Sequence, residues 1–382
     1  MSTVDFGLFG APPAFTEPAF VGQRYFPSWD RYQQAFREIF ERQYYTEYGP
    51  LNQQLEQKLQ AFLGVKHAIC VTNETVGLMM AADAMGLSGR VILPRHAPAA
   101  STQSLVWAGL EPVYCELDPG TYQICVEQVT PLIDKNVCAI MGVHLWGGAC
   151  DTQALARIAN AHGIQLYFDA AHAFGCTVDQ VCIGHFGRCE VFSFHQDNIL
   201  NATEGGCICT NDDQIAARLR TMRSSSGAGE AVPVDKTVNG RFSEAQAAIA
   251  LMNLEDFSVH RQNNEDLHGQ YEARLGSIPG LQLVKPSGVS LSNFQCALCR
   301  VDELEYGLPR DALIALLAAE NVFAQPVPEY PRRLNGPDSL TAYCIQLPIG
   351  AGMTVQRVER VCTLLTQAHR GATGIRSRLG VG

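Results

Sequence analysis

The segment IQLYFDAAHAFG (residues 164–175) is followed by CEVFSFHQDN (189–198) and GCICTN (206–211), and these three segments decide the fold. Each contains a short apolar run that is typical of a buried strand, and the first two runs end in polar residues. In an open parallel sheet, functional groups gather at the carboxyl ends of the strands, beside a crevice. We therefore expect Asp169 and Ser193 to lie near one another at one edge of a sheet.

The same rhythm extends over much of the chain. Over residues 45–256, short apolar runs alternate with amphipathic runs, which predicts a mostly parallel sheet covered by helices. A long helix is expected over residues 243–276. After Pro279 the pattern changes to separated strands and helices. The sequence therefore predicts an α/β protein with a large domain over residues 1–256, N-terminal segment included, and a smaller α+β domain over residues 257–382.

Composition excludes several classes of function. The formal net charge of -10 argues against a nucleic-acid surface, which needs basic patches. No apolar run reaches the roughly 20 residues of a transmembrane helix, and the N-terminus lacks the pattern of a signal peptide. The 14 cysteines are therefore expected to be reduced and buried, and the Cys296-x-x-Cys299 pair lacks the second pair of a typical zinc site. We expect a cytoplasmic protein that acts on a small molecule and holds no metal.

Several polar residues at predicted strand ends could carry chemistry. Asp169 could hold the ring nitrogen of a cofactor protonated, although a buried structural aspartate is an equally ordinary interpretation. Asn73 and Thr75 lie where a strand meets a helix, a place that suits a phosphate but where capping is also common. Ser193 and His195 end another strand and would face the same crevice. None of these residues identifies a function by itself.

Taken in order and spacing, they resemble the DegT/DnrJ/EryC1/StrS family of sugar aminotransferases. The resemblance covers nearly the whole chain, from Tyr48-Gly49-Pro50, through GVKHAICVTN and the block FDAAHAFG at residues 168–175, to NGRFSEAQAAIALMNLEDF. It implies fold type I, the fold of aspartate aminotransferase, with a site at the interface of a homodimer. It also implies pyridoxal phosphate as cofactor and substrates such as nucleotide-linked keto sugars or aminocyclitols.

The resemblance assigns roles to individual residues. It implies that Asp169 contacts the pyridine nitrogen of the cofactor and that His172 lies by the ring hydroxyl. Ser193 matches a serine that contacts the phosphate, and Asn239 matches an asparagine that reaches the phosphate across the dimer interface. Asn73 and Thr75 belong to the phosphate-binding turn. The implied cofactor site therefore draws on four separate segments of the chain.

The departures from the family pattern concern the same site. The family loop usually reads Ser-Phe-His-Ala-Thr-Lys, whereas this chain reads Ser-Phe-His-Gln196-Asp197-Asn198. A carboxamide cannot form the Schiff base that a lysine forms, because its nitrogen lone pair is delocalised. Glu74 replaces a small residue of the phosphate-binding turn, and Pro98 stands where an aromatic ring usually stacks on the pyridine. The segment VPEYPRRLNG also looks shortened.

Three interpretations of the altered site stay open. The first is non-covalent use of pyridoxal or pyridoxamine phosphate, with His195 or Asp197 as the base. The second is a catalyst without the cofactor, which would use residues of the site as acid–base pairs or as metal ligands: His96, His172, His195, Asp169, Asp197 and Glu74. The third is a non-catalytic subunit that pairs with an active paralogue. We favour an enzyme of amino-sugar or natural-product biosynthesis that makes no lysine aldimine, in which Asn198 replaces the catalytic lysine.

Overall fold

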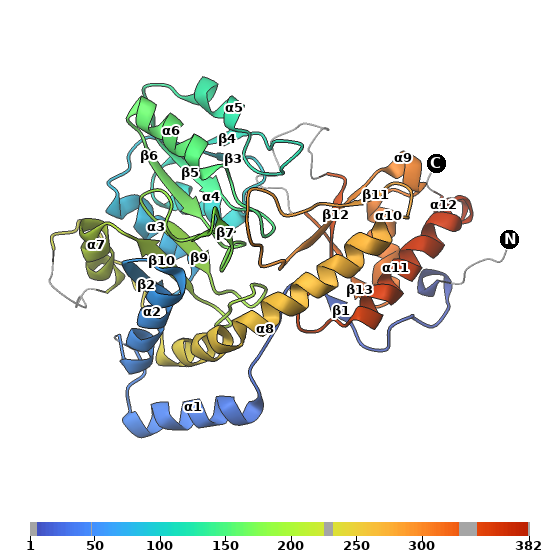
Figure 1. Cartoon of the computed structure of the whole chain (residues 1–382), viewed down its shortest axis with the longest axis horizontal. Coiled ribbons are helices and arrows are strands. Elements are labelled where there is room, and N and C mark those ends of the chain that lie inside the picture. The colour runs from blue at the N-terminus through green and yellow to red at the C-terminus, as the bar shows by residue number, and fades with distance from the viewer. Residues whose placement is uncertain (1–5, 47, 225–231, 328–341, 381–382) are drawn as a thin grey trace. The chain divides into compact units, whose positions relative to one another are not determined.

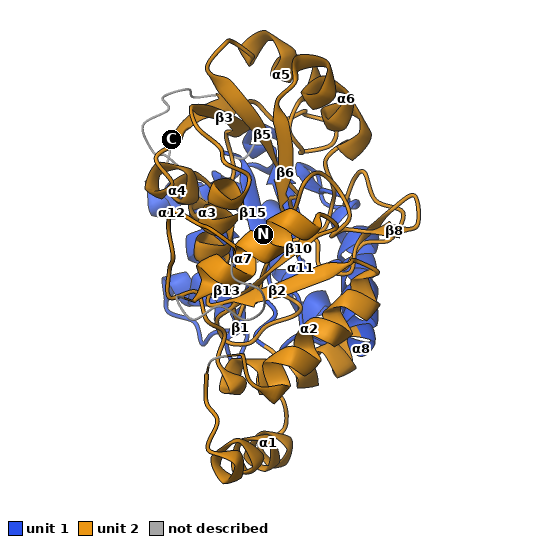
Figure 2. Ribbon diagram, turned by 90° about the vertical axis from the view of Figure 1, so that its left-hand side faces the viewer, with its two compact units in different colours: residues 1–24, 258–285, 294–382 blue, residues 25–257, 286–293 orange. Residues whose placement is uncertain are grey.

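The computed structural model describes residues 6–46, 48–224, 232–327 and 342–380 (Figure 1). The chain forms two compact units, which Figure 2 shows in different colours. The larger unit comprises residues 25–257 and 286–293. The smaller unit comprises residues 1–24, 258–285 and 294–382.

The larger unit contains a seven-stranded sheet with the strand order β2-β10-β9-β6-β5-β3-β4. Strands β4, β3, β5, β6 and β9 are parallel to one another, whereas β10 is antiparallel to both β9 and β2. Because β10 is antiparallel to both neighbours, β2 runs in the same direction as β9. The strands are β2 (His67–Val71), β3 (Arg90–Pro94), β4 (Glu111–Cys115), β5 (Val137–Val143), β6 (Gln165–Asp169), β9 (Glu190–Ser193) and β10 (Gly206–Thr210). The mostly parallel sheet predicted from the sequence is confirmed.

Helices follow these strands along the chain. In α2 the apolar residues Leu55, Leu59 and Leu63 recur at a spacing of four and are buried, and Gly64 ends the helix in the left-handed conformation. The helices of this unit are α1 (Trp29–Arg42), α2 (Pro50–Leu63), α3 (Glu74–Ala84), α4 (Ala99–Trp107), α5 (Val126–Val129), α6 (Thr152–His162) and α7 (Asp213–Arg223). A short hairpin, β7 (Thr177–Val178) and β8 (Val181–Cys182), and the 3-10 turn Thr130–Leu132 complete the unit.

The long helix α8 (Glu244–Leu275) matches the helix predicted over residues 243–276. It begins with a capping box, in which the Ser243 backbone N–H donates to Gln246 Oε1 (3.0 Å) and the Gln246 N–H donates to Ser243 Oγ (3.2 Å). The buried carboxylate of Glu244 accepts the N–H groups of Leu51 and Asn52, both at 3.0 Å. These are two of the unpaired N–H groups at the start of α2, so Glu244 joins the starts of two helices.

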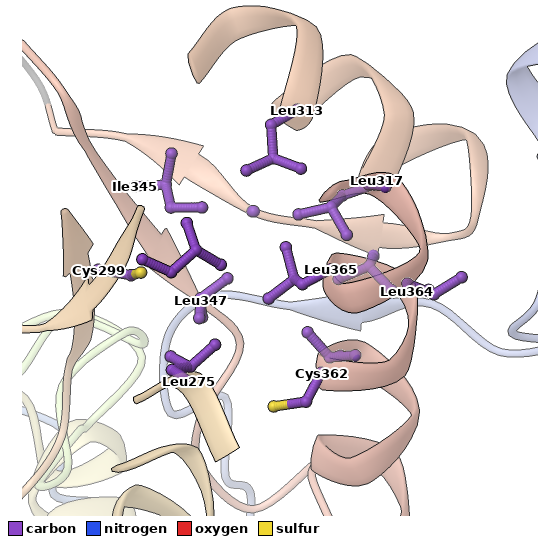
Figure 3. Packing of buried hydrophobic residues seen from close by; sticks show 14 of the residues in the cluster. Leu275, Cys299, Leu313, Leu317, Ile345, Leu347, Cys362, Leu364 and Leu365 are labelled. Carbon is purple, nitrogen blue, oxygen red and sulfur yellow. The ribbon is translucent and has the colours of Figure 1, made fainter. Parts of the chain in front are cut away.

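The smaller unit is built on a second, antiparallel sheet with the order β11-β12-β15-β14. Its apolar core includes leucines of two helices and residues of the sheet, and Figure 3 shows Leu313, Leu317 and Leu365 directed toward Ile345 and Leu347. The elements are the 3-10 turn Gly7–Phe9, β1 (Ala19–Phe20), β11 (Leu281–Leu283), β12 (Ala297–Val301), α9 (Glu303–Tyr306), α10 (Arg310–Ala319), β13 (Val322–Phe323), β14 (Gln325–Pro326), β15 (Cys344–Leu347), α11 (Val355–Arg370) and α12 (Ala372–Leu379).

The two units differ from the predicted domain bounds at the N-terminus. Residues 1–24 belong to the smaller unit, whereas the sequence placed them in the large domain. The physical reason is local packing: Phe6 and Phe15 are buried in the core of the smaller unit, and β1 pairs with β13. Glu320 also accepts the N–H groups of Gly7 and Ala14.

The segment 286–293 differs from the predicted bounds in the opposite direction, since it joins the larger unit. The carbonyl oxygen of Ser287 accepts the Ala149 N–H at 2.8 Å, and that of Leu291 accepts the Thr177 N–H at 3.0 Å. In the part of the chain that the structure describes, no helix has both the length and the apolar composition needed to cross a bilayer. The same residues contain no group of three or more His, Cys, Asp or Glu that could hold a metal ion.

Candidate active site

Sheet direction determines which predicted site residues share an edge. Strands β2, β3, β6 and β9 all run in the same direction, so the segments that follow them leave the sheet at the same edge. These segments carry Asn73 and Glu74 after β2, and His96 after β3. Asp169 is the last residue of β6 and Ser193 is the last residue of β9. The antiparallel strand β10 begins at this edge with Gly206, opposite Ser193.

Asp169 is fully buried and accepts two hydrogen bonds. The Ser101 hydroxyl donates to its Oδ2 at 2.5 Å, and the Ala171 backbone N–H donates to its Oδ1 at 3.0 Å. Both donors stabilise a negative charge on the carboxylate. Ser101 lies in the first turn of α4, and the sequence prediction missed it. The signal that selected Thr75, a hydroxyl just after a strand at this edge, would also have selected Ser101.

His172 lies three residues after Asp169, in the turn that leaves β6. Its Nδ1 atom lies 3.4 Å from the backbone nitrogen of Trp146, which donates to it, so the neutral ring carries its hydrogen on Nε2. Burial lowers the pKa of His172, and the nearby charge of Asp169 opposes that shift only in part. His172 is therefore neutral near pH 7 and presents an N–H donor. The Asn293 carboxamide fixes the turn by donating to the carbonyl oxygens of His172 (3.1 Å) and Phe174 (3.0 Å).

The predicted phosphate-binding turn is the start of α3. The Asn73 side-chain oxygen accepts the N–H of Val76 at 2.9 Å, which is the bond of an ordinary N-cap. The Thr72 N–H donates to the carbonyl oxygen of Gly240 at 2.9 Å, and Thr75 is half-buried in the first turn of the helix. The structure therefore gives the Asn73 carboxamide the capping role, one of the two roles that the sequence left open.

Glu74 is the first residue of α3, and its side chain is directed inward. Its carboxyl group lies close enough to Asp169 and Ser193 for both to act on its protonation. Its Oε1 atom is covered and receives no hydrogen bond from the described residues. Burial raises the pKa of Glu74 well above its usual value, and the charges of Asp169 and Glu204 raise it further. Glu74 therefore lies close to both residues that the family resemblance assigns to the cofactor ring and phosphate.

Ser193 and Gly206 lie next to the start of α3, where Glu74 is the first helical residue. Ser193 is 4% exposed and pairs with Gly206 across the sheet. A Cβ atom on Gly206 would lie 2.8 Å from the carbonyl oxygen of Phe192 and 3.1 Å from the backbone nitrogen of Glu74. Only glycine lets the start of β10 pass so close to the start of α3 without displacing one of them.

The loop between β9 and β10 is closed by backbone hydrogen bonds. Phe194 N–H donates to Gly205 O at 2.8 Å, and Gln196 N–H donates to Thr203 O at 3.0 Å. Within the loop, the Asn198 N–H donates to the His195 carbonyl at 3.0 Å, and the Asn198 residue is only 8% exposed. Asn198 is therefore held at a buried position of a tight loop.

Three further polar side chains of this loop, those of His195, Asp197 and Glu204, are more exposed than Asn198. His195 Nδ1 lies 3.7 Å from Asp197 Oδ2, and His195 Nε2 lies 3.6 Å from Glu204 Oε1. These three side chains are 41%, 45% and 60% exposed. Two carboxylates flank the histidine, and solvent screens the interaction.

The remaining predicted residues fall into two groups. His96 is buried in the segment between β3 and α4, and Pro98 occupies the N-cap position of α4. Asn239 is exposed, and its side-chain oxygen accepts a hydrogen bond from Arg241 Nε at 2.9 Å. Its role across a dimer interface stays a prediction. Most of the segment VPEYPRRLNG lies outside the described residues.

Comparison with known proteins identifies the family. The sequence model of the DegT/DnrJ/EryC1/StrS aminotransferase family matches residues 29–366, so the chain belongs to this family. It is 33% identical over 309 residues to a dTDP-4-amino-4,6-dideoxy-D-glucose transaminase of Shigella dysenteriae, a match that covers 81% of this chain and 84% of the relative. Its fold is that of the fold type I aminotransferases, as the resemblance predicted.

Solved structures support the same assignment. The structure of DesI in the presence of its TDP-sugar product superposes with a TM-score of 0.90 at 34% identity, covering 98% of this chain and 99% of DesI. NtdA of Bacillus subtilis with bound cofactor PMP superposes with a TM-score of 0.78 at 18% identity, covering 94% of this chain and 88% of NtdA. The second likeness concerns the fold alone.

The residues of this site do not fit pyridoxal or pyridoxamine phosphate as they stand. Asp169, which would pair with a protonated ring nitrogen, and Ser193, which would donate to the phosphate, both face the Glu74 carboxyl. A carboxylate within about 4 Å of a phosphate repels it by roughly 1–4 kcal/mol per charge pair at effective dielectrics from water to protein surface. A Glu74 side chain turned toward solvent would avoid most of this repulsion, but in this structure its Oε1 atom is covered.

Proposed function

We propose that this chain is an enzyme of small-molecule biosynthesis, related to the sugar aminotransferases, that forms no internal aldimine with a lysine. The observation that carries the proposal is Asn198, which occupies a buried position in the loop between β9 and β10. This is the loop in which the family resemblance places the Schiff-base lysine. A carboxamide at that position cannot replace the amine, because its nitrogen is not nucleophilic.

The other lysines of the chain support the proposal. The sequence contains five, and four of them pair with carboxylates elsewhere: Lys58 with Glu255, Lys66 with Asp213, Lys236 with Asp83, and Lys285 with Glu272. The fifth, Lys135, is exposed just before β5. None of the five lysines lies in the loop between β9 and β10.

The substrate class follows from the relatives. Their names describe a dTDP-amino-sugar transaminase and GDP-perosamine synthases, and we propose a nucleotide-linked sugar or a similar biosynthetic intermediate for this chain as well. The remaining side chains supply acid–base groups: a neutral His172 that donates from Nε2, and the facing carboxyls of Glu74 and Asp169. We also propose a cytoplasmic homodimer, in which Asn239 would contribute from the second subunit.

Borohydride reduction in the presence of pyridoxal phosphate tests the proposal. We expect the intact mass of the purified chain to stay unchanged, because no lysine aldimine forms that the reagent could trap. A homologue that carries the loop lysine serves as the positive control. A covalent adduct mapped to any of the five lysines, or transfer of an amino group from glutamate to a dTDP- or GDP-linked keto sugar, would overturn the proposal.

A further inference from the structure

The position of Glu74 is determined by its backbone. The preceding residue, Asn73, caps α3, and the Thr72 N–H is bonded to Gly240. Gly206 passes so close to the Glu74 nitrogen that this part of the turn has little room to move. The side chain therefore starts from the edge of the sheet at which β6 ends with Asp169 and β9 ends with Ser193.

Burial and the nearby charge of Asp169 both favour the protonated form of Glu74 by raising its pKa. Two carboxylates in direct contact in a buried site cannot both be charged at low cost, so one stays protonated. Asp169 already accepts hydrogen bonds from Ser101 and the Ala171 N–H, and these stabilise its charged form. Glu74 Oε1 is covered and receives no donor from the described residues, so the proton belongs on Glu74.

We propose that the Glu74 carboxyl takes the place of the cofactor at Asp169 and Ser193, so that this chain binds neither pyridoxal phosphate nor pyridoxamine phosphate. The pocket holds instead a proton shared by two carboxyl groups. This goes beyond the proposed function, which requires only that no lysine aldimine forms and would tolerate a non-covalently bound cofactor.

Two physical effects oppose the cofactor. A protonated pyridine nitrogen would have to displace Glu74 from Asp169, and a phosphate would have to displace it from Ser193. If Glu74 stayed in place and lost its proton, it would repel the phosphate across a short distance in a partly dry site. A small residue at position 74 removes both effects at once and leaves Asp169, Ser193 and the helix N-terminus intact.

Equilibrium dialysis with pyridoxamine phosphate, followed by its absorbance, tests the proposal on four proteins: the natural chain, Glu74→Ala, Asn198→Lys and the double variant. We expect no retained cofactor in the natural chain and at least tenfold tighter binding by Glu74→Ala, a factor that corresponds to about 1.4 kcal/mol. With pyridoxal phosphate, we expect a borohydride-trapped aldimine in the double variant and none in Asn198→Lys. Melting curves of all four proteins, each checked by circular dichroism, show which variants are folded.

Glu204→Ala is the matched control. Glu204 is an exposed carboxylate whose charge also acts on Glu74, but the Glu74 carboxyl, not that of Glu204, faces Asp169 and Ser193. We expect this variant to retain no cofactor. Stoichiometric pyridoxamine phosphate in the natural chain, binding by Glu74→Ala no tighter than by the natural chain, or an aldimine in Asn198→Lys alone would overturn the inference. The first result would leave the proposed function standing, whereas an adduct in the natural chain would overturn the proposed function.

An infrared spectrum gives an independent readout that needs no cofactor. A protonated carboxyl has a C=O stretching band that carboxylates lack. We expect this band in the natural chain at neutral pH and its loss in Glu74→Gln. If the band persisted unchanged in Glu74→Gln, the shared proton would not belong to this pair.

Discussion

Two buried carboxyl clusters of the larger unit compensate their charge in different ways. Glu56 and Arg223 are 1% and 3% exposed and meet at 2.6 Å, between Glu56 Oε1 and Arg223 Nη1. Glu56 Oε1 also accepts the Cys70 N–H at 2.9 Å, and Arg223 Nη1 donates to the Cys70 carbonyl at 2.9 Å. For Glu74, which lies close to Asp169, no cation among the described residues raises or lowers the pKa to a comparable extent, and we infer a proton on Glu74 instead.

The Glu56–Arg223 cluster stabilises the fold, whereas the Glu74–Asp169 cluster can exchange a proton. An arginine is charged at every ordinary pH, so the cation beside Glu56 is permanent. A shared proton can leave, so the Glu74–Asp169 pair depends on pH and on whatever enters the pocket. Removing one partner should therefore destabilise the protein most at the Glu56–Arg223 cluster and stabilise it at the Glu74–Asp169 cluster.

Arg223→Ala should have the largest effect on stability. It leaves the buried carboxylate of Glu56 without its cation, and breaking a buried pair in this way costs about 3–5 kcal/mol. The denaturant midpoint of the variant measures the loss. Arg188→Ala is the control, because the Arg188–Asp212 pair is 46% and 31% exposed and should contribute about 0–1 kcal/mol. Equal losses in the two variants would show that Glu56 and Arg223 do not form a buried pair in solution.

Glu244→Ala should have an intermediate effect on stability. It extends the comparison to a third buried carboxyl group, which is stabilised in another way. Glu244 makes no ion pair with the described residues; its two carboxyl oxygens accept the N–H groups of Leu51 and Asn52 at the start of α2. Their loss should cost about 2 kcal/mol, the upper range for a helix cap. Glu244→Gln keeps one acceptor oxygen, so its loss should be about half as large. If Glu244→Gln were as destabilising as Glu244→Ala, shape rather than hydrogen bonding would decide the contribution.

Glu74→Gln should have the smallest effect on stability, and it should stabilise the protein where the other two variants destabilise it. The pKa of Glu74 is raised in the folded chain, so the folded state keeps a proton that the unfolded state releases as the pH rises above about 4.5. The natural chain therefore loses about 1 kcal/mol of stability between about pH 4.5 and 5.5 relative to the variant. Unfolding curves of both proteins over this range measure the difference. A difference that stayed constant with pH would contradict the raised pKa.

Much of the fold could be predicted from local sequence patterns. The apolar runs around Asp169 and Ser193 became adjacent strands of one sheet, and the helix predicted over residues 243–276 was found over Glu244–Leu275. These elements depend on periodicity and capping, which are properties of neighbouring residues. That residues 1–24 belong to the smaller unit could not be predicted in this way. It depends on Phe6 and Phe15 packing against a core whose other residues lie some 260 positions further along the chain.

The candidate site shows the same limit. The sequence selected Asp169, Ser193 and Glu74, but not Ser101, whose hydroxyl bond to Asp169 joins residues 68 positions apart. It also left two roles open for Asn73, and only the Val76 N–H at 2.9 Å assigned it to capping. Contacts of this kind depend on strand order and register, which local patterns do not encode.

The sequence by itself determined the family, the alternation of strands and helices, and the presence of Asn198 in the loop after β9, because motifs and periodicity are written in consecutive residues. Only the tertiary structure decided the direction of the Glu74 side chain. Residue type allows it to turn either to solvent or into the site, and the choice depends on the cap at Asn73, the close approach of Gly206 and the donors around Asp169. These contacts come from four strands that the chain brings together only on folding, and they place a proton where the family resemblance places a cofactor.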